Sequence, residues 1–188
     1  MREQVVLAST SPRRIELLSR ITPDFVTVPS TIEEVSSGPP EKQVLTLARS
    51  KAHDVANRHE GIIVGADTVV VLDDRIFGKP QSRAEARQML ECLSNREHTV
   101  LTGLCVLSTK TEEHRQAVEK TTVSFRALSD EEIKAYLDTG EYEDKAGGYA
   151  IQGRAGVFVK RICGDFYNVM GLPICRLYLL LAEMGIKV

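Results

Sequence analysis

An aspartate lies inside an apolar stretch that is long enough to form a buried strand. The stretch Ile62–Leu72 is rich in valine and isoleucine, and its apolar residues resume after Asp67 and Thr68. A structural aspartate held by a turn is one explanation, because strands do end in aspartate, but here the strand continues. Burying a carboxylate is unfavourable without a cation or metal ion beside it. The stretch therefore predicts a central strand that carries a functional Asp67.

The rest of the chain supplies both strands and helices for such a fold. Its 188 residues are 43% hydrophobic and 27% charged, which suits a single domain over residues 1–188 with a substantial core. Apolar residues recur with a helical period over 41–59, and capping boxes open helices at Ser82 and Ser129. Short strands are expected at 4–9 and 25–29, β-rich segments at 99–108 and 121–128 with a variable connection at 109–119, and a strand at 157–162. Further helices are expected at 11–20 and 173–184. This mixture predicts an α/β fold with a mixed, elongated β-sheet and flanking helices.

Composition excludes several classes of protein. The net charge is −2, so the basic excess typical of nucleic-acid-binding proteins is missing, and we expect no nucleic-acid partner. No apolar stretch approaches the ~20 residues of a membrane span, which predicts a cytoplasmic protein with no membrane partner. The four cysteines are scattered among apolar neighbours and are expected to be buried, reduced thiols.

Common catalytic signatures are also absent from the sequence. The chain has no Walker A motif, no G-x-G-x-x-G after a strand, no H-E-x-x-H and no G-x-S-x-G. Its four histidines are far apart in sequence, which argues against a histidine metal site. The chemistry of an enzyme with this sequence would therefore rest on carboxylates, lysines and arginines.

The segment from Ser9 to Arg14 has the composition of a phosphate-binding junction. It contains Ser9, Ser11, Arg13 and Arg14 and lies between an expected strand and a helix that begins near Pro12. Hydroxyls, backbone N–H groups at a helix N-terminus and guanidinium groups all favour a bound anion. A plain helix cap followed by solvated arginines is the alternative.

Three further charged residues give weaker signals. Lys79 is held between a glycine and a proline, which suits a fixed positive charge beside a phosphate, although most loop lysines are solvated. Lys51 lies on the apolar face of the 41–59 helix, where a lysine can also extend its ammonium group to solvent. Glu34, in the pair Glu33-Glu34 after the second expected strand, could supply an oxygen ligand for Mg²⁺, as could Glu33, although paired glutamates in a loop are more often solvated.

A glycine-rich segment at 144–153 offers a residue that could read a base. Two adjacent glycines permit positive φ or close approach of a ligand. The side chain of Gln152 has both a donor and an acceptor, as recognition of a base edge requires. A glycine-rich hairpin with a surface glutamine is the alternative.

Taken together, these segments carry a family resemblance over nearly the whole chain. The matching segments are Leu7-Ala8-Ser9-Thr10-Ser11-Pro12-Arg13-Arg14, Gly65-Ala66-Asp67-Thr68, Gly78-Lys79-Pro80, 144–153 and 164–173. In this order they resemble the Maf family of nucleotide pyrophosphatases. The resemblance implies a fold similar to the inosine triphosphate pyrophosphatases, with two lobes around a nucleotide cleft, and a homodimer. It also implies hydrolysis of a nucleoside triphosphate to a monophosphate and pyrophosphate, with a divalent cation, Mg²⁺ or Mn²⁺.

The resemblance also assigns roles to individual residues. The family's general base corresponds to Asp67, its functional glutamate to Glu34, and its two lysines to Lys51 and Lys79. The cation would be held through Glu34, Asp67 or both, and whether Asp67 acts as base, metal ligand or both stays open.

A second group of residues bears on specificity. The residues that match are Arg13, Thr68 and Gln152, with Gln152 in a Tyr-x-Ile-Gln-Gly segment like that of the branch acting on dTTP and UTP. The main alternative is a non-catalytic nucleotide-binding regulator of cell division or septum formation. A phosphotransferase is a third reading, although no acceptor site is evident.

Overall fold

The computed structural model describes residues 3–35 and 37–187. The chain forms two compact units. The first comprises Met1–Asp67, Thr102–Glu119 and Gly171–Val188, and the second comprises Thr68–Leu101 and Lys120–Met170. The single domain over 1–188 stays a prediction.

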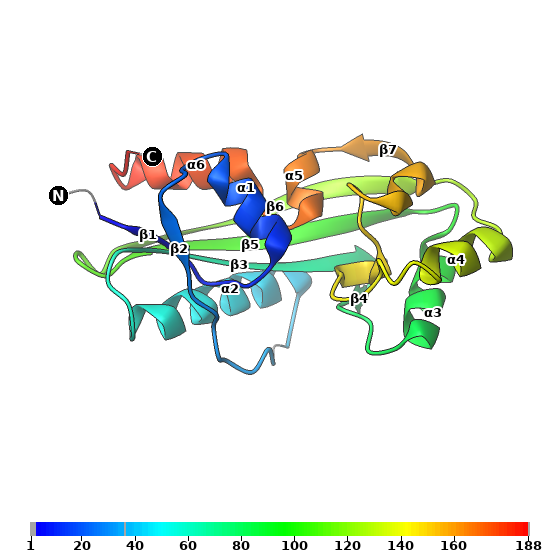
Figure 1. Ribbon diagram of the computed structural model, residues 1–188, viewed down its shortest axis with the longest axis horizontal. Helices are drawn as coiled ribbons and strands as arrows, with labels where there is room; N and C mark the ends of the chain where they lie inside the picture. The colour runs from blue at the N-terminus through cyan, green and yellow to red at the C-terminus, as the bar shows by residue number, and fades with distance from the viewer. Residues whose placement is uncertain (1–2, 36, 188) are drawn as a thin grey trace. The chain divides into compact units, whose positions relative to one another are not determined.

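Within the described residues, seven strands form one mixed sheet with the order β2-β1-β3-β5-β6-β7, and β4 pairs with β3 off this path. Strand β1 pairs in parallel with both β2 and β3, whereas β4 is antiparallel to β3 and β7 is antiparallel to β6. The elements, in chain order (Figure 1), are β1 (Val5–Leu7), α1 (Pro12–Ser19), β2 (Phe25–Thr27), α2 (Pro40–Ala56), β3 (Ile62–Leu72), β4 (Arg75–Phe77), α3 (Arg83–Leu93), β5 (Glu97–Ser108), β6 (His114–Phe125), α4 (Asp130–Leu137), η1 (Ala146–Gly148), η2 (Arg154–Phe158), β7 (Val159–Cys163), α5 (Phe166–Met170) and α6 (Ile174–Glu183). The predicted α/β fold with a mixed sheet and flanking helices is confirmed.

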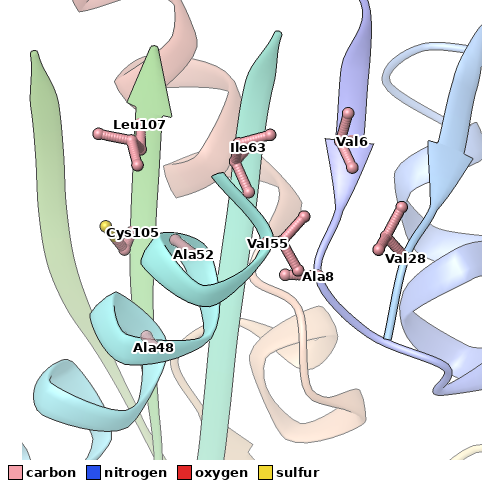
Figure 2. Packing of buried hydrophobic residues seen from close by; sticks show 9 residues of the cluster. All are labelled: Val6, Ala8, Val28, Ala48, Ala52, Val55, Ile63, Cys105 and Leu107. Carbon is pink, nitrogen blue, oxygen red and sulfur yellow. The ribbon is translucent and has the colours of Figure 1, made fainter. Parts of the chain in front are cut away.

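In the first unit, helix α2 packs very closely against the sheet. Small residues on the helix pack against apolar side chains of β1, β3 and β5, and the residues of this cluster are buried. An added Cβ at Gly65 of β3 would run into the carbonyl oxygen of Ala48, and one at Gly103 of β5 into that of Val44. The two glycines therefore let the helix backbone approach the strands directly. The core cluster (Figure 2) consists of Val6, Ala8, Val28, Ala48, Ala52, Val55, Ile63, Cys105 and Leu107.

The second unit is built around buried aromatic rings. His98, Phe125 and Tyr149 form mutual edge-to-face contacts, with ring centroids 4.9 to 5.5 Å apart. Tyr136 of α4 meets Phe158 at 5.3 Å, and α3 packs against α4 and η1. Such contacts add stabilisation beyond the apolar area they bury.

Several boundaries differ from those expected. Strand β6 begins at His114, so residues 114–119 belong to a strand rather than to the connection, because pairing with β5 extends it. The capping box at Ser129 is complete. At Ser82 only half of a box forms, since the Glu85 carboxylate accepts from the backbone N–H of Gln81 instead.

The expectation for the cysteines was correct in part. All four thiols are free, and Cys105 is buried and Cys92 half-buried, but Cys163 and Cys175 are exposed. The exposed pair lies on β7 and on the outward side of α6, where local apolar neighbours in sequence do not imply burial. Within residues 3–35 and 37–187, no helix is both long and apolar enough to cross a bilayer.

Candidate active site

The ammonium group of Lys51 lies between two carboxylates. Its Nζ donates to Oδ1 of Asp67 at 2.7 Å and lies 2.7 Å from Oε1 of Glu34. Lys51 and Asp67 are 7% and 6% exposed, whereas the Glu34 side chain is half exposed. Extension of Lys51 to solvent, one of the two sequence interpretations, is therefore wrong. Asp67 is a buried carboxylate with a cation beside it, as its place in an apolar strand predicted.

Close packing of α2 on the sheet brings Lys51 to Asp67. Side chains alternate along a strand, so Gly65 and Asp67 project from the same face of β3, the face that α2 covers. On the helix, Ala48 and Lys51 are one turn apart and share the buried stripe. Because Gly65 lets the helix backbone approach, Lys51 spans the remaining gap with its own side chain.

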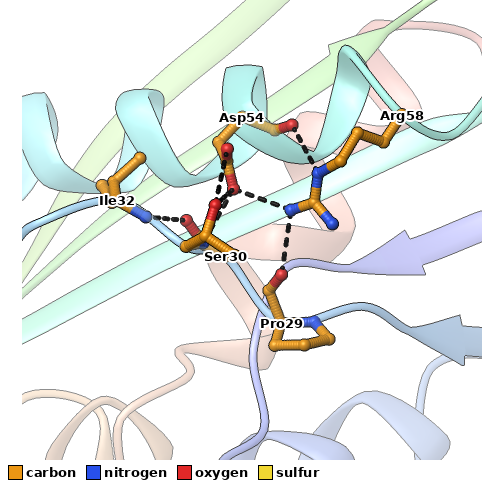
Figure 3. A network of polar contacts seen from close by, with 6 residues as sticks. Pro29, Ser30, Ile32, Asp54 and Arg58 are labelled. Carbon is orange, nitrogen blue, oxygen red and sulfur yellow. Dashed lines mark hydrogen bonds and ion pairs between the residues drawn. The ribbon is translucent and has the colours of Figure 1, made fainter.

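A separate polar network holds the loop that carries Glu34. The Asp54 carboxylate on α2 accepts from the backbone N–H of Thr31 at 2.9 Å and from Nη2 of Arg58 at 2.8 Å. Arg58 Nη2 also donates to the carbonyl oxygen of Pro29 at 3.0 Å (Figure 3). The hydrogen bond from Thr31 is the largest cause of a lowered pKa at Asp54, and Arg58 adds to it. The network anchors residues 29–31 to α2. Only two residues then separate the anchored segment from Glu34.

Two arginines from the start of α1 add positive charge to the same unit. Arg14 donates from Nε to the carbonyl oxygen of Gly171 at 2.9 Å. Burial lowers the pKa of Arg14 from its ordinary value, Asp67 and Glu34 oppose this shift, and Arg13 reinforces it. An arginine stays charged through such shifts. These five side chains comprise three cations and two carboxylates, a balance that favours a polyanionic ligand.

The Ser9–Ser11 segment lies at the end of β1, as expected. Leu7 is in register with Val64, and the chain leaves the sheet after Ala8 donates to the carbonyl oxygen of Val64 at 2.9 Å. Ser9 Oγ then accepts from the backbone N–H of Ser11 at 3.2 Å. The hydroxyl of Ser11, the residue before α1, makes no capping hydrogen bond within the described part of the chain. The junction thus has the form of an anion-binding helix start.

The remaining predicted residues belong to the second unit. Thr68 follows Asp67 on β3, is half-buried, and projects from the opposite face of the strand. Lys79 is exposed in the loop before α3, where its carbonyl oxygen accepts from Nε2 of Gln81 at 3.2 Å. Gln152 is exposed in the turn between the buried Ile151 and η2.

The number of neighbouring carboxylates limits how many protein ligands a metal ion could have. Residues 3–35 and 37–187 contain no group of three or more His, Cys, Asp and Glu side chains arranged to hold a metal ion. Glu34 and Asp67 do converge on one cation, the Lys51 ammonium. One or two carboxylates completed by substrate oxygens and water is the usual protein environment of Mg²⁺. The residues present therefore fit a divalent cation that binds together with a phosphate substrate.

Comparison with known proteins identifies the family. The family model described as Maf-like protein matches residues 4–184. The chain belongs to the Maf family.

Curated Maf relatives match it over nearly their whole length. The protein named dTTP/UTP pyrophosphatase from Thermococcus gammatolerans is 50% identical over 98% of each chain. Proteins of the same name from Thermococcus onnurineus and a Thermoanaerobacter species are 51% and 48% identical, over 98% and 93% of this chain and 99% and 93% of theirs. Among solved structures, the Staphylococcus aureus Ham1 protein superposes with a TM-score of 0.49 at 17% identity, over 65% of this chain and 72% of that one.

Some residues around this Maf site had no individual signal in the sequence. The carbonyl oxygen of Gly171 orients Arg14, and a backbone carbonyl leaves no trace in residue type. Gly103 was visible only as a glycine inside a predicted strand, which can indicate close backbone approach. Asp54 and Arg58 are four residues apart on α2 and look like an ordinary surface ion pair.

Proposed function

We propose that this Maf protein hydrolyses nucleoside triphosphates between the α- and β-phosphates, releasing a monophosphate and pyrophosphate, and prefers dTTP and UTP. The buried ion pair between Lys51 and Asp67, with Glu34 on the same ammonium, carries the proposal. Burying a charge pair carries a desolvation penalty, and such pairs are typical of sites that act on charged groups. The relatives named dTTP/UTP pyrophosphatase, about half identical over nearly the full chain, support the substrate class.

Asp67 serves as the general base. Lys51 donates to Oδ1 of Asp67, so we assign Oδ2 to the attacking water. As the water oxygen forms a bond to the α-phosphorus, its proton passes to Asp67. The bond from the α-phosphorus to the bridging oxygen breaks, and pyrophosphate leaves with the electron pair.

The cationic side chains bind the triphosphate. Lys51, Arg13 and Arg14 offset its negative charge in the first unit, and the backbone N–H groups around Ser9 and Ser11 donate to phosphate oxygens. Lys79 supplies a further point charge. Donors fixed before the substrate arrives stabilise the charge that develops on the leaving pyrophosphate.

A divalent cation, Mg²⁺ or Mn²⁺, would be held through Glu34, Asp67 or both. When bound it supplies positive charge to the phosphate oxygens. Glu34 is suited to this role because its side chain is half exposed while its loop is anchored through Asp54.

Gln152 and Thr68 read the base. Thymine and uracil present a C4 carbonyl and an N3–H, and the amide of Gln152 can pair with both. Cytosine presents an amine and an unprotonated N3 at these positions, so the same amide orientation does not fit it. Thr68 contributes a hydroxyl that can donate or accept.

We also propose a cytoplasmic homodimer.

Product analysis tests the proposed reaction. The purified protein is incubated with each common nucleoside triphosphate and Mg²⁺ or Mn²⁺, and monophosphate and pyrophosphate are quantified. We expect equal amounts of both products, and a ~10²- to 10⁴-fold loss of kcat in Asp67→Asn, the range of general-base contributions. Asp74→Asn, an exposed aspartate in the β3–β4 turn, is the matched control. Nucleotide binding without turnover would favour the regulator, and full activity in Asp67→Asn would exclude the assigned base.

Replacing the proposed base reader tests specificity. Gln152→Ala should lower the ratio of kcat/KM for UTP over CTP more than it lowers kcat on UTP, because the removed amide contacts only the base. The measurement is steady-state kinetics on both nucleotides. An equal loss on UTP and CTP would contradict base reading by Gln152.

A further inference from the structure

Gln152 stands at an exposed tip between two buried residues. Ile151 before it is 7% exposed and Ala155 after it is fully buried. The tip is closed by a tight turn in which the backbone N–H of Gly153 donates to the carbonyl oxygen of Ala150 at 3.1 Å. An exposed side chain on a short turn keeps one direction only if both flanks are fixed.

Helix α4 fixes the flank that precedes Gln152. The hydroxyl of Tyr136, on the last turn of the helix, accepts from the backbone N–H of Ala150 at 3.3 Å. The neighbouring Tyr149 is buried, and its hydroxyl lies 2.8 Å from Nε2 of His98. Two buried hydrogen bonds therefore hold the chain just before the tip.

The turn that ends α4 fixes the other flank. The Glu141 carboxylate accepts from the backbone N–H groups of Arg154 at 3.1 Å and Ala155 at 3.5 Å. Glu141 is itself held, because its backbone N–H donates to Oγ1 of Thr139 at 3.1 Å. Hydrogen bonds to an ionised carboxylate are stronger than those between neutral groups.

Gly153 belongs to the same arrangement. An added Cβ at this position would occupy the place of the Glu141 carboxylate. The absence of a side chain at Gly153 is therefore what allows Glu141 to reach the two amides beyond it.

We propose that Glu141 is a positioning residue for Gln152, holding the turn so that the amide faces the base and thereby setting the choice of nucleotide. The inference rests on the proposed function, in which Gln152 reads the base. Glu141 acts through the backbone of residues 153–155 and does not touch the substrate.

A double-mutant cycle tests this coupling. Glu141→Ala should reduce the UTP over CTP ratio of kcat/KM about ten-fold, the loss expected when hydrogen bonds to a charged group are removed, with a smaller change in kcat on UTP. In the Gln152→Ala background the same substitution should cause no further loss of discrimination. Glu141→Gln, which keeps an acceptor oxygen, should retain part of the discrimination. Glu143→Ala, an exposed glutamate two residues along, is the matched control.

Two outcomes would overturn the inference. Discrimination unchanged in Glu141→Ala is one, and an undiminished effect of Glu141→Ala when Gln152 is absent is the other. Gly153→Ala is a second variant, and it should reproduce the loss of discrimination because its Cβ displaces the carboxylate.

Hydrogen exchange separates this inference from the proposed function. The amides of residues 154 and 155 should exchange faster in Glu141→Ala than in the wild-type protein, independently of any activity. If no triphosphate is turned over, the proposed function fails, while unchanged exchange at these amides overturns the role of Glu141 by itself.

Discussion

At Lys51 a single ammonium group lies between two carboxylates, the buried Asp67 and the half-exposed Glu34. Its Nζ is 2.7 Å from oxygens of both Asp67 and Glu34, and its side chain is 9% exposed. Removing one partner of a buried ion pair is far more damaging than removing both, because the remaining charge has lost its solvent and its counterion.

Neutralising Lys51 alone should therefore be strongly destabilising. We expect Lys51→Met to lower the free energy of unfolding by about 3–5 kcal/mol, and the double variant Lys51→Met/Asp67→Asn to recover a large part of that loss. Urea unfolding of the wild type, both single variants and the double variant gives the coupling energy. Losses that simply add would contradict a direct interaction in solution.

Helix α2 brings Lys51 to Asp67 because the strands beneath the helix carry glycine at the points of closest approach. Gly65 and Gly103 lie under the carbonyl oxygens of Ala48 and Val44, so the helix sits at backbone distance from β3 and β5. A methyl group at either site must lift the helix or bend the strand. Either movement displaces Lys51, which is on the same buried stripe.

Gly103→Ala should consequently affect both stability and catalysis. We expect a loss of roughly 2 kcal/mol from overpacking, together with reduced turnover although residue 103 is not part of the proposed chemistry. Gly78→Ala is the control for stability, since an added Cβ there meets no described atom within 4 Å, and its effect should stay within about 0.5 kcal/mol. A wild-type free energy of unfolding in Gly103→Ala would contradict the close contact between α2 and β5.

For the molecule as a whole, His98 links folding to pH. The ring is 2% exposed, and burial lowers its pKa from the ordinary 6.5 to about 4. The unfolded chain therefore binds a proton at a higher pH than the folded one does. The contribution of the neutral His98 ring to the free energy of unfolding is fully present above pH 6.5, and it is lost as the pH drops from 6.5 towards 4.

The predicted loss over that window is about 3 kcal/mol. Urea unfolding between pH 7 and 5 should show the decline in the wild type and a shallower one in His98→Phe, whereas His59→Gln, at an exposed histidine, should keep it. A small part of the slope should remain, because partial desolvation and the neighbouring Arg49 also lower the pKa of His53, an effect that solvent weakens at this exposed side chain. Titration of the His98 ring near pH 6.5 by NMR would contradict the expectation.

The sequence predicted the parts of the fold that depend on local pattern. The bounds of β3 agree with the apolar stretch, and the helix expected over 41–59 forms as α2 over Pro40–Ala56. The start of β6 was missed because its first residues are polar and become a strand only by pairing with β5.

The residues of the candidate site also differ in how far the sequence predicted them. A charge inside an apolar pattern identified Asp67, since burial is readable from periodicity. The same kind of pattern gave only a weak signal for Lys51, whose role came from the family resemblance. Glu34 was identified from the family resemblance, but its ion pair with Lys51 depends on a loop path that Asp54 and Thr31 define in space. Glu141 gave no signal, because its partners are backbone amides.

The distribution of thiols makes this protein suitable for spectroscopic labelling. Cys175 is exposed in the first unit and Cys163 in the second, while burial raises the pKa of the Cys105 thiol to about 11 and makes it slow to react near neutral pH. With the half-buried Cys92 replaced by serine, a donor and an acceptor fluorophore can be attached to the two native exposed positions. Energy transfer between the two fluorophores would then report the distance between the labelled cysteines in solution, before and after a nucleotide is added.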